Sequence, residues 1–399
     1  MLAFAQPANT AEYPDLSTTH TGSYVLPACD PPGAPVVYTT SDGVGYCSNQ
    51  MAILYNQSYW QRDTPDTGMR TDYQNANLME RLGEPEKFYY GDPGDQYADF
   101  ENLFLYRTKV KGKAPIIIFI HGGSWQGGSA LEHLVPAEMF MYAGAHYISL
   151  DFVSVYDTVP NGNLMEMAIE IRKAIAWVYK NADSFNGDKD RIFVTGRSSG
   201  GHLCGVAMTT DWTLFGLPAN TLKGGLCSSG MYDLEPVSLS ARAEFVNFTP
   251  EVIEELSAIK NLQYLNSPIY IVWASRDTPE FQRQSRDFVL AAQAAGKDVK
   301  HAIGWGYQHP EIPETLGNPF GVSGRLALEM MGLEVTIAEK ENASFKPDKW
   351  TNHKPNNGKN SQASYKPDHG KNNQAAAAVK IGAKILSGFV SLITALFSW

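Results

Sequence analysis

Four short, largely apolar runs that contain β-branched residues constrain the fold of this chain most strongly. They cover residues 114–120, 147–150, 191–195 and 268–273. Such runs are typical of strands buried on both faces, as in a parallel sheet. Residues 163–181 and 280–295 carry apolar side chains at the spacing of amphipathic helices. Strands that alternate with helices predict an α/β fold with a mostly parallel central sheet and helices on both faces.

A Gly-x-Ser-x-Gly sequence at 196–200 directly follows the third run, and residues 201–208 can continue as a helix. A strand, a sharp turn and a helix form the nucleophile elbow of the α/β-hydrolase fold, in which the serine hydroxyl projects from the sheet. The flanking glycines are needed because side chains there would crowd the turn. The pattern predicts Ser198 as a catalytic nucleophile. An ordinary glycine-rich loop is the alternative.

The sequence His-Gly-Gly-Ser-Trp at 121–125 directly follows the first run. Hydrolysis through an acyl-enzyme places negative charge on the former carbonyl oxygen, so backbone N–H groups must already point there. We expect the N–H groups of Gly122, Gly123 and Ser199 to form this oxyanion hole. A phosphate-binding glycine turn is the alternative, but no Lys-Ser/Thr follows and no GxGxxG is present.

A serine nucleophile needs a histidine base and an acid that fixes the tautomer of that histidine, in the chain order Ser, Asp/Glu, His. Asp277 follows the fourth apolar run and is the preferred acid. Asp287 would lie inside a helix and Asp233 follows a different strand. His309, in a loop after a short expected strand, is the preferred base, and His301 in that strand is the alternative.

Three residues near these motifs are candidates for contact with the substrate: Trp125, Arg197 and Tyr307. The aromatic residues, including Trp305, are equally suited to core packing. Arg197 can bind a substrate carboxylate, but an ion pair with an acidic neighbour is the preferred interpretation.

The net charge of −10 argues against nucleic acid as a partner. The four cysteines form no CxxC pair and no His/Cys cluster with zinc spacing, so no metal site is expected. Four free thiols are the preferred interpretation, and a Cys29–Cys47 disulfide in an exported protein is the alternative. The N-terminal residues 1–6 are too short for a signal peptide, although Ala3-Phe4-Ala5 would suit a remnant of one. A cytoplasmic or peripheral membrane location is therefore favoured, with export as the alternative.

Composition divides the chain into four parts. Residues 1–50 are rich in Pro, Gly, Thr and Ser, which predicts an irregular arm. Residues 51–336 are expected to form the catalytic domain. Residues 337–374 predict a disordered, flexible linker in which Ala343-Ser-Phe-Lys-Pro-Asp348 recurs as Ala363-Ser-Tyr-Lys-Pro-Asp368. Residues 375–399 predict an apolar amphipathic helix.

The polar residues of that last segment are spaced four and three apart from Lys380 to Ser398, which places them on one face of a helix. The segment is marginal for crossing a membrane. A helix that lies on a membrane surface or binds a protein partner is preferred. A helix folded back on the enzyme and a true membrane span are the alternatives.

Several segments together resemble the kynurenine formamidase (arylformamidase) and feruloyl-esterase-like branch of α/β-hydrolases. They are residues 55–57, 121–125, 190–203, 229–236 and 277–288, and the resemblance covers roughly 51–335. It implies a serine hydrolase that cleaves an ester or an N-formyl amide of a small molecule with an aromatic part, without a metal or organic cofactor. Carried onto this chain, the triad of the branch falls on Ser198, Asp277 and His309.

Two positions depart from the pattern of this branch. Arg197 precedes the serine, and Pro310 follows His309 where an aromatic residue is usual. Both departures bear on which substrate is expected, more than on which reaction is catalysed. The expected function is therefore a carboxylesterase or arylformamidase-like hydrolase, with kynurenine formamidase proper as the alternative. In a different class, the chain would be a non-catalytic binding protein recruited through its tail.

Overall fold

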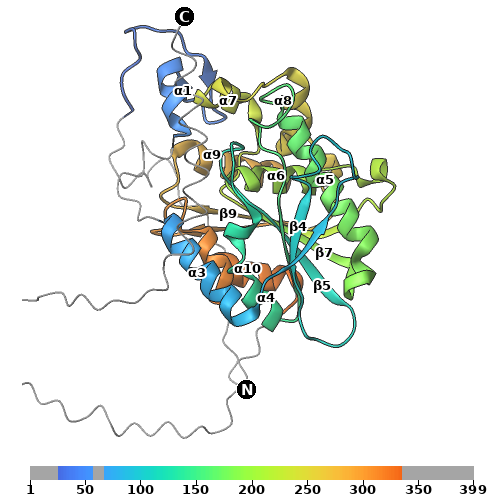
Figure 1. Ribbon diagram of the computed structural model, residues 1–399. Coiled ribbons are helices and arrows are strands. Elements are labelled where there is room, and N and C mark those ends of the chain that lie inside the picture. The colour runs from blue at the N-terminus through green and yellow to red at the C-terminus, as the bar shows by residue number, and fades with distance from the viewer. Residues whose placement is uncertain (1–25, 57–66, 335–399) are drawn as a thin grey trace, which may run out of the picture. The chain divides into compact units, whose positions relative to one another are not determined.

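The computed structural model describes residues 26–56 and 67–334, with the backbone alone for 67–73 (Figure 1). Contacts divide the chain into two units, Met1–Ile337 and Ala338–Trp399. The expected linker at 337–374 and the expected helix at 375–399 lie outside the described residues.

An eight-stranded sheet forms the centre of the first unit, in the order β10-β9-β8-β7-β5-β6-β4-β3. From β5 through to β10 all neighbouring strands are parallel, whereas β4 pairs antiparallel with β6 and β3 antiparallel with β4. The mostly parallel sheet is therefore confirmed. The strands are β3 (Glu86–Tyr89), β4 (Asn102–Tyr106), β5 (Ala114–Ile120), β6 (His146–Leu150), β7 (Gly187–Arg197), β8 (Leu222–Ser228), β9 (Ile269–Ala274) and β10 (Val299–Gly304).

Helices cover both faces of this sheet (Figure 1). Alternate residues of β5 point to opposite faces and enter two separate apolar clusters. Ile116, Ile118 and Ile120 pack with α5, α6 and α9, while Ile117 and Phe119 pack with α4 and α10. The helices are α1 (Ser48–Leu54), α3 (Thr67–Leu82), α4 (Ala137–Tyr142), α5 (Leu164–Asn181), α6 (Ser199–Met208), α7 (Leu234–Ser238), α8 (Pro250–Leu256), α9 (Pro279–Ala294) and α10 (Val322–Met331).

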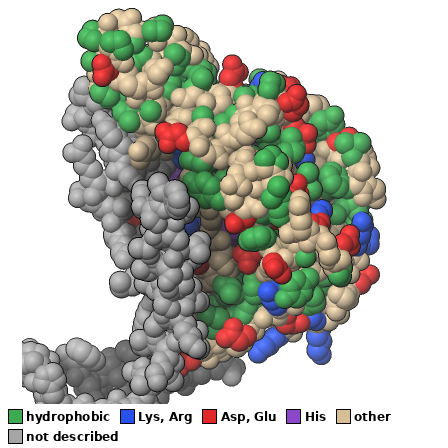
Figure 2. All heavy atoms as spheres, turned by 45° about the horizontal axis from the view of Figure 1, so that its top comes forward, with side chains coloured by type: hydrophobic (Ala, Val, Ile, Leu, Met, Phe, Trp, Pro, Cys, Tyr) green, Lys and Arg blue, Asp and Glu red, His purple; other side chains and the backbone are tan. Residues whose placement is uncertain are grey.

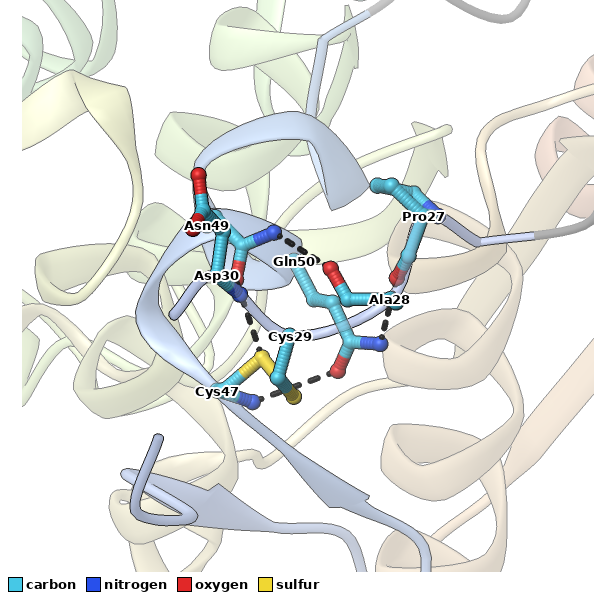
Figure 3. The surroundings of a disulfide bond; sticks show 7 residues. All are labelled: Pro27, Ala28, Cys29, Asp30, Cys47, Asn49 and Gln50. Atoms are coloured by element: carbon cyan, nitrogen blue, oxygen red, sulfur yellow. Dashed lines mark hydrogen bonds between the residues drawn. A yellow bond between two sulfur atoms is a disulfide. The ribbon is translucent and has the colours of Figure 1, made fainter. Parts of the chain in front are cut away.

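Residues 26–50 contain more regular structure than an irregular arm would. Strands β1 (Tyr38–Thr39) and β2 (Gly45–Tyr46) pair antiparallel, and α1 begins at Ser48. Residues 27–30 are held against the start of α1 (Figure 3). Asn49 Nδ2 donates to Ala28 O at 2.9 Å, Gln50 Nε2 donates to Pro27 O at 2.9 Å, and a disulfide joins Cys29 to Cys47.

A second disulfide joins Cys204 in α6 to Cys227 in β8, so the expectation of four free thiols is wrong. The paired residues are 18 and 23 positions apart in sequence, and the fold brings their Cα atoms to 5.9 and 5.6 Å. These are distances at which a disulfide can form. Cys204 meets Cys227 only because α6 packs against β8, which the cysteine count and spacing do not reveal.

Acidic side chains are spread over the described part of the face drawn in Figure 2, with basic and apolar side chains between them. This distribution agrees with the net charge of −10. Within residues 26–56 and 67–334, no helix is long and apolar enough to cross a membrane.

Candidate active site

The turn between β7 and α6 holds Ser198 in a backbone conformation that non-glycine residues rarely adopt, with φ 54° and ψ −124°. A conformation of this kind costs of order 1–3 kcal/mol and persists only where its surroundings enforce it. Here the Ser198 N–H donates to Ser228 O, at the end of the adjacent strand, over 2.9 Å. The turn therefore has the strained strand-to-helix form of a nucleophile elbow.

The glycines on either side of this turn are required by backbone contacts. A Cβ atom on Gly200 would lie 2.2 Å from Ile120 O and 2.4 Å from His121 O. A Cβ atom on Gly196 would lie 2.2 Å from Gly200 O. Backbone atoms cannot swing aside as a flexible side chain can, so the Gly-x-Ser-x-Gly spacing has a steric origin.

The glycine turn, residues 121–125 after β5, lies directly against Ser198. A Cβ atom on Gly122 would lie 3.1 Å from the Ser198 Cβ, and Gly123 has φ 128°, which favours glycine. In the described part of the chain, the N–H groups of Gly122 and Gly123 donate no hydrogen bond. Ser199 is the first residue of α6, where the N–H has no partner within the helix. Unpartnered backbone donors therefore lie beside the serine on two elements.

Asp277 and His309 form a hydrogen bond at the edge of the sheet where the parallel strands end. Asp277 lies just after β9, His309 lies in the loop after β10, and both are buried. His309 Nδ1 is 2.5 Å from Asp277 Oδ1. Because a carboxylate only accepts, the Nδ1 proton is donated to it, which leaves Nε2 with the lone pair that a base requires.

Two further donors hold the Asp277 carboxylate. Its Oδ2 accepts from the Ala274 N–H at 2.9 Å and from the Ser229 hydroxyl at 2.6 Å. Ser229 directly follows β8, and the residue before it accepts the N–H of Ser198, so hydrogen bonds lead from the serine turn to the acid. The sequence prediction did not include Ser229, whose signal is its position after the strand adjacent to β7.

The alternative acids and base have other surroundings. His301 lies within β10, with its ring stacked on that of Trp273 at 5.7 Å between centroids. Asp287 forms an ion pair with Arg283 within α9, at 2.8 Å. Asp233 caps α7 by accepting the Glu235 N–H at 3.0 Å. The geometry thus favours Asp277 and His309.

The aromatic candidates differ in exposure. Trp125 is buried, and its indole N–H donates to His202 Nδ1 at 3.2 Å, which ties the glycine turn to α6. Tyr307 and Trp305, in the loop that leads to His309, are 36% and 60% exposed. Tyr307 and Trp305 are therefore open to solvent, while Trp125 packs beneath the turn.

Arg197 lies among charged and imidazole side chains. Burial lowers its pKa, and Glu132 and Glu314 oppose this effect. Its charge in turn contributes to the lowered pKa values of His121 and His133. Among the described residues, however, no ion pair joins Arg197 to a carboxylate, and its buried Nε has no hydrogen-bond partner. The preferred ion pair with an acidic neighbour is therefore not seen.

His121 holds the glycine turn in place through a hydrogen bond and a ring contact. Burial lowers the pKa of its imidazole to about 4, so the ring is neutral near pH 7. Its Nδ1 is 2.8 Å from Gly122 O, and its ring stacks on Phe152 at 4.2 Å. Donation from Nδ1 to that carbonyl fixes the peptide plane of the turn.

Comparisons with known proteins agree with this geometry. The BD-FAE family model matches residues 103–216, which contain the glycine turn and the serine turn. The kynurenine formamidase of Danio rerio is 28% identical over 300 residues, which cover 73% of this chain and 99% of that protein. Esterase LipC of Mycobacterium tuberculosis is 29% identical over 231 residues, which cover 51% of this chain and 54% of that protein.

Solved esterase and thioesterase structures share the fold. A putative thioesterase from Silicibacter sp. TM1040 superposes with a TM-score of 0.58 at 17% identity, over 68% of this chain and 96% of its own. An esterase from Pyrobaculum calidifontis gives a TM-score of 0.52 at 19% identity, over 69% of this chain and 95% of its own.

The fold and these similarities define a serine hydrolase of the α/β-hydrolase class, an enzyme that cleaves carboxylic ester or amide bonds. Within that class the chain is most like the kynurenine formamidase and esterase branch, to which its similarities point.

Proposed function

We propose that Ser198, His309 and Asp277 act as nucleophile, base and acid in the hydrolysis of a small ester or N-formyl amide. The observation that carries this proposal is the bond from His309 Nδ1 to Asp277, at the sheet edge where Ser198 occupies its strained turn. Of the nine histidines, His309 has the chain position and the carboxylate partner that this role requires.

In the first half of the reaction, Ser198 Oγ attacks the carbonyl carbon while His309 Nε2 takes the hydroxyl proton. The N–H groups of Gly122, Gly123 and Ser199 stabilise the negative oxygen of the tetrahedral intermediate. The intermediate collapses to an acyl-enzyme, and the alcohol or amine leaves with the proton from His309. Asp277 stabilises the imidazolium and keeps the proton on Nδ1.

In the second half, water replaces the leaving group. His309 removes a proton from the water as it attacks the acyl carbon, and the same oxyanion site stabilises the new intermediate. Its collapse releases the carboxylic acid and returns the proton to Ser198 Oγ. The residues of the chain account for every proton transfer in this cycle.

We expect the substrate to carry an aromatic part. Tyr307 and Trp305 expose aromatic surface on the loop before His309, and planar groups stack on such surfaces. Similarity to the Danio rerio kynurenine formamidase over 99% of that protein favours an N-formyl aryl amide as a second substrate type beside esters.

Labelling with a fluorophosphonate, followed by peptide mass spectrometry, tests this assignment directly. The purified protein should react covalently at Ser198 and hydrolyse 4-nitrophenyl acetate, and N-formylkynurenine should be tested beside it. Labelling at another residue would overturn the nucleophile assignment. No labelling and no hydrolysis would favour the non-catalytic binding protein.

Residues 375–399 are proposed to dock the enzyme on a membrane surface, and a protein partner is the alternative. The support is the one-sided arrangement of polar residues from Lys380 to Ser398. In liposome co-sedimentation, full-length protein should pellet with anionic vesicles, while a chain ending at Glu339 should stay in the supernatant. Equal sedimentation of the two chains would exclude membrane docking.

A further inference from the structure

Arg242 is a buried cation that the mechanism above does not use. It lies in a short 3-10 turn, Ala241–Glu244, between α7 and α8, and is only 9% exposed. Burial lowers the pKa of its guanidinium to about 10, so it stays charged near pH 7. A buried charge is unfavourable by several kcal/mol unless an opposite charge or good hydrogen bonds compensate it.

The described residues around Arg242 do not supply that opposite charge. Its Nη1 donates to Tyr55 O at 3.1 Å, and its Nε is buried without a hydrogen-bond partner in the described part of the chain. Among residues 26–56 and 67–334, no carboxylate forms an ion pair with it. Two other buried arginines differ: Arg172 pairs with Glu255 at 2.7 Å, and Arg283 pairs with Glu280 at 2.7 Å. Arg197, beside Ser198, shares with Arg242 a buried Nε that has no partner among the described residues.

Aromatic rings surround the guanidinium. Its Cζ lies 5.5 Å from the ring centre of Tyr55, 5.7 Å from that of Phe281 and 6.0 Å from that of Trp125. Cation–π contacts of this kind contribute about 0.5–2 kcal/mol each. They stabilise the charge in part, and they leave the edge of the guanidinium that carries Nε without an acceptor.

These rings also connect Arg242 to the candidate active site. Trp125 belongs to the glycine turn that passes against Ser198. Phe281 packs edge-on against the imidazole of His309, with 4.8 Å between the ring centres. The Phe281 ring therefore contacts both the guanidinium and the proposed base.

We propose that Arg242 binds a carboxylate of the substrate, so that the enzyme selects esters or amides that carry a carboxylate besides the bond to be cleaved. This inference rests on the proposed function. A carboxylate accepts two parallel hydrogen bonds from a guanidinium edge, which includes the donor that now lacks a partner. The enclosing rings exclude water, and this strengthens the ion pair.

Two matched substrate pairs test the inference, one for each side of the scissile bond. On the acyl side, the 4-nitrophenyl monoester of glutaric acid is compared with 4-nitrophenyl pentanoate. On the leaving-group side, 4-acetoxybenzoate is compared with its methyl ester. The wild-type enzyme should have the higher kcat/KM for the anionic member of at least one pair.

The variant Arg242→Gln should lower that anionic-to-neutral ratio of kcat/KM about 10- to 100-fold, as expected for the loss of a charged hydrogen bond. Arg242→Lys, which keeps the charge but loses the planar fork, should retain part of the preference. Arg172→Gln is the matched control, because this buried arginine already has its partner in Glu255. That variant should leave the ratio unchanged.

Neutral members preferred by the wild-type enzyme in both pairs would overturn the inference, even if no Arg242 variant folds. An anionic preference that persists in folded Arg242→Gln would also overturn it. In both cases hydrolysis of neutral esters and labelling of Ser198 would continue, so the proposed function would stand. Absence of hydrolysis and of labelling would instead remove the proposed function.

Discussion

Replacing Ser198 with alanine should lower kcat for 4-nitrophenyl acetate by about 10⁴- to 10⁶-fold, the range seen when a triad nucleophile is removed. The change deletes the oxygen that forms the acyl-enzyme, and the remaining backbone donors can assist only direct attack by water. Steady-state kinetics with freshly purified protein, together with the fluorophosphonate label, measure both consequences. The label should be lost completely.

Ser154→Ala is the matched control for this result. Ser154 follows β6 at the same edge of the sheet and donates to Asp157 at 2.6 Å, but it lies on a different loop. Its loss should change kcat less than about threefold, because exposed or locally bonded side chains outside a triad contribute little. Unchanged turnover in Ser198→Ala, with an unaltered melting temperature, would mean that another residue is the nucleophile.

Asp277→Asn should reduce kcat by about 10⁴-fold while leaving the fold intact. The amide would present a donor or a weaker acceptor to His309 Nδ1, so the imidazole would lose both its fixed tautomer and the charge that stabilises its protonated form. The second oxygen accepts from Ser229 and Ala274, and an amide oxygen can keep these bonds. Kinetics with the same ester measure the loss.

Asp233→Asn provides the comparison, since Asp233 is an alternative acid that follows a different strand and caps α7. Asparagine caps helices about as well as aspartate, so this variant should stay within about twofold of the wild-type rate. A large loss in Asp233→Asn with normal turnover in Asp277→Asn would reverse the assignment of the acid.

The strands that the sequence predicts best are those whose neighbours demand apolar side chains on both faces. Residues 114–120 form β5 with the expected bounds, and Asn163 caps α5 at the expected start. The strand expected ahead of Asp233 was predicted without bounds, because the sequence of β8 contains Gly224 and Gly225. A Cβ atom there would lie 2.8 Å from Met330 Cγ and 2.5 Å from Met208 Cγ, so close helix packing, not strand propensity, selects these glycines.

The candidate site, too, was predicted only where short local motifs mark it. Local patterns mark Ser198 and the glycine turn because their chemistry requires a fixed spacing along one strand and its loop. The contacts that complete the site join distant segments: Ser229 to Asp277, and Arg242 to Tyr55 and Phe281. Nothing in the sequence near Arg242 signals a missing partner, because the absence of a carboxylate among its described neighbours is a property of the folded structure.

The disulfide between Cys204 and Cys227 makes maturation of this enzyme depend on an oxidant. Both sulfur atoms are fully buried, one on the helix that begins beside Ser198 and the other on the adjacent strand. Such a bond must close during folding, before the core excludes the oxidising reagent or isomerase. Disulfides form and persist in secretory and periplasmic environments and are rare in reducing cytosol. An expression host that exports the chain should therefore yield more active enzyme than one that keeps it in the cytosol.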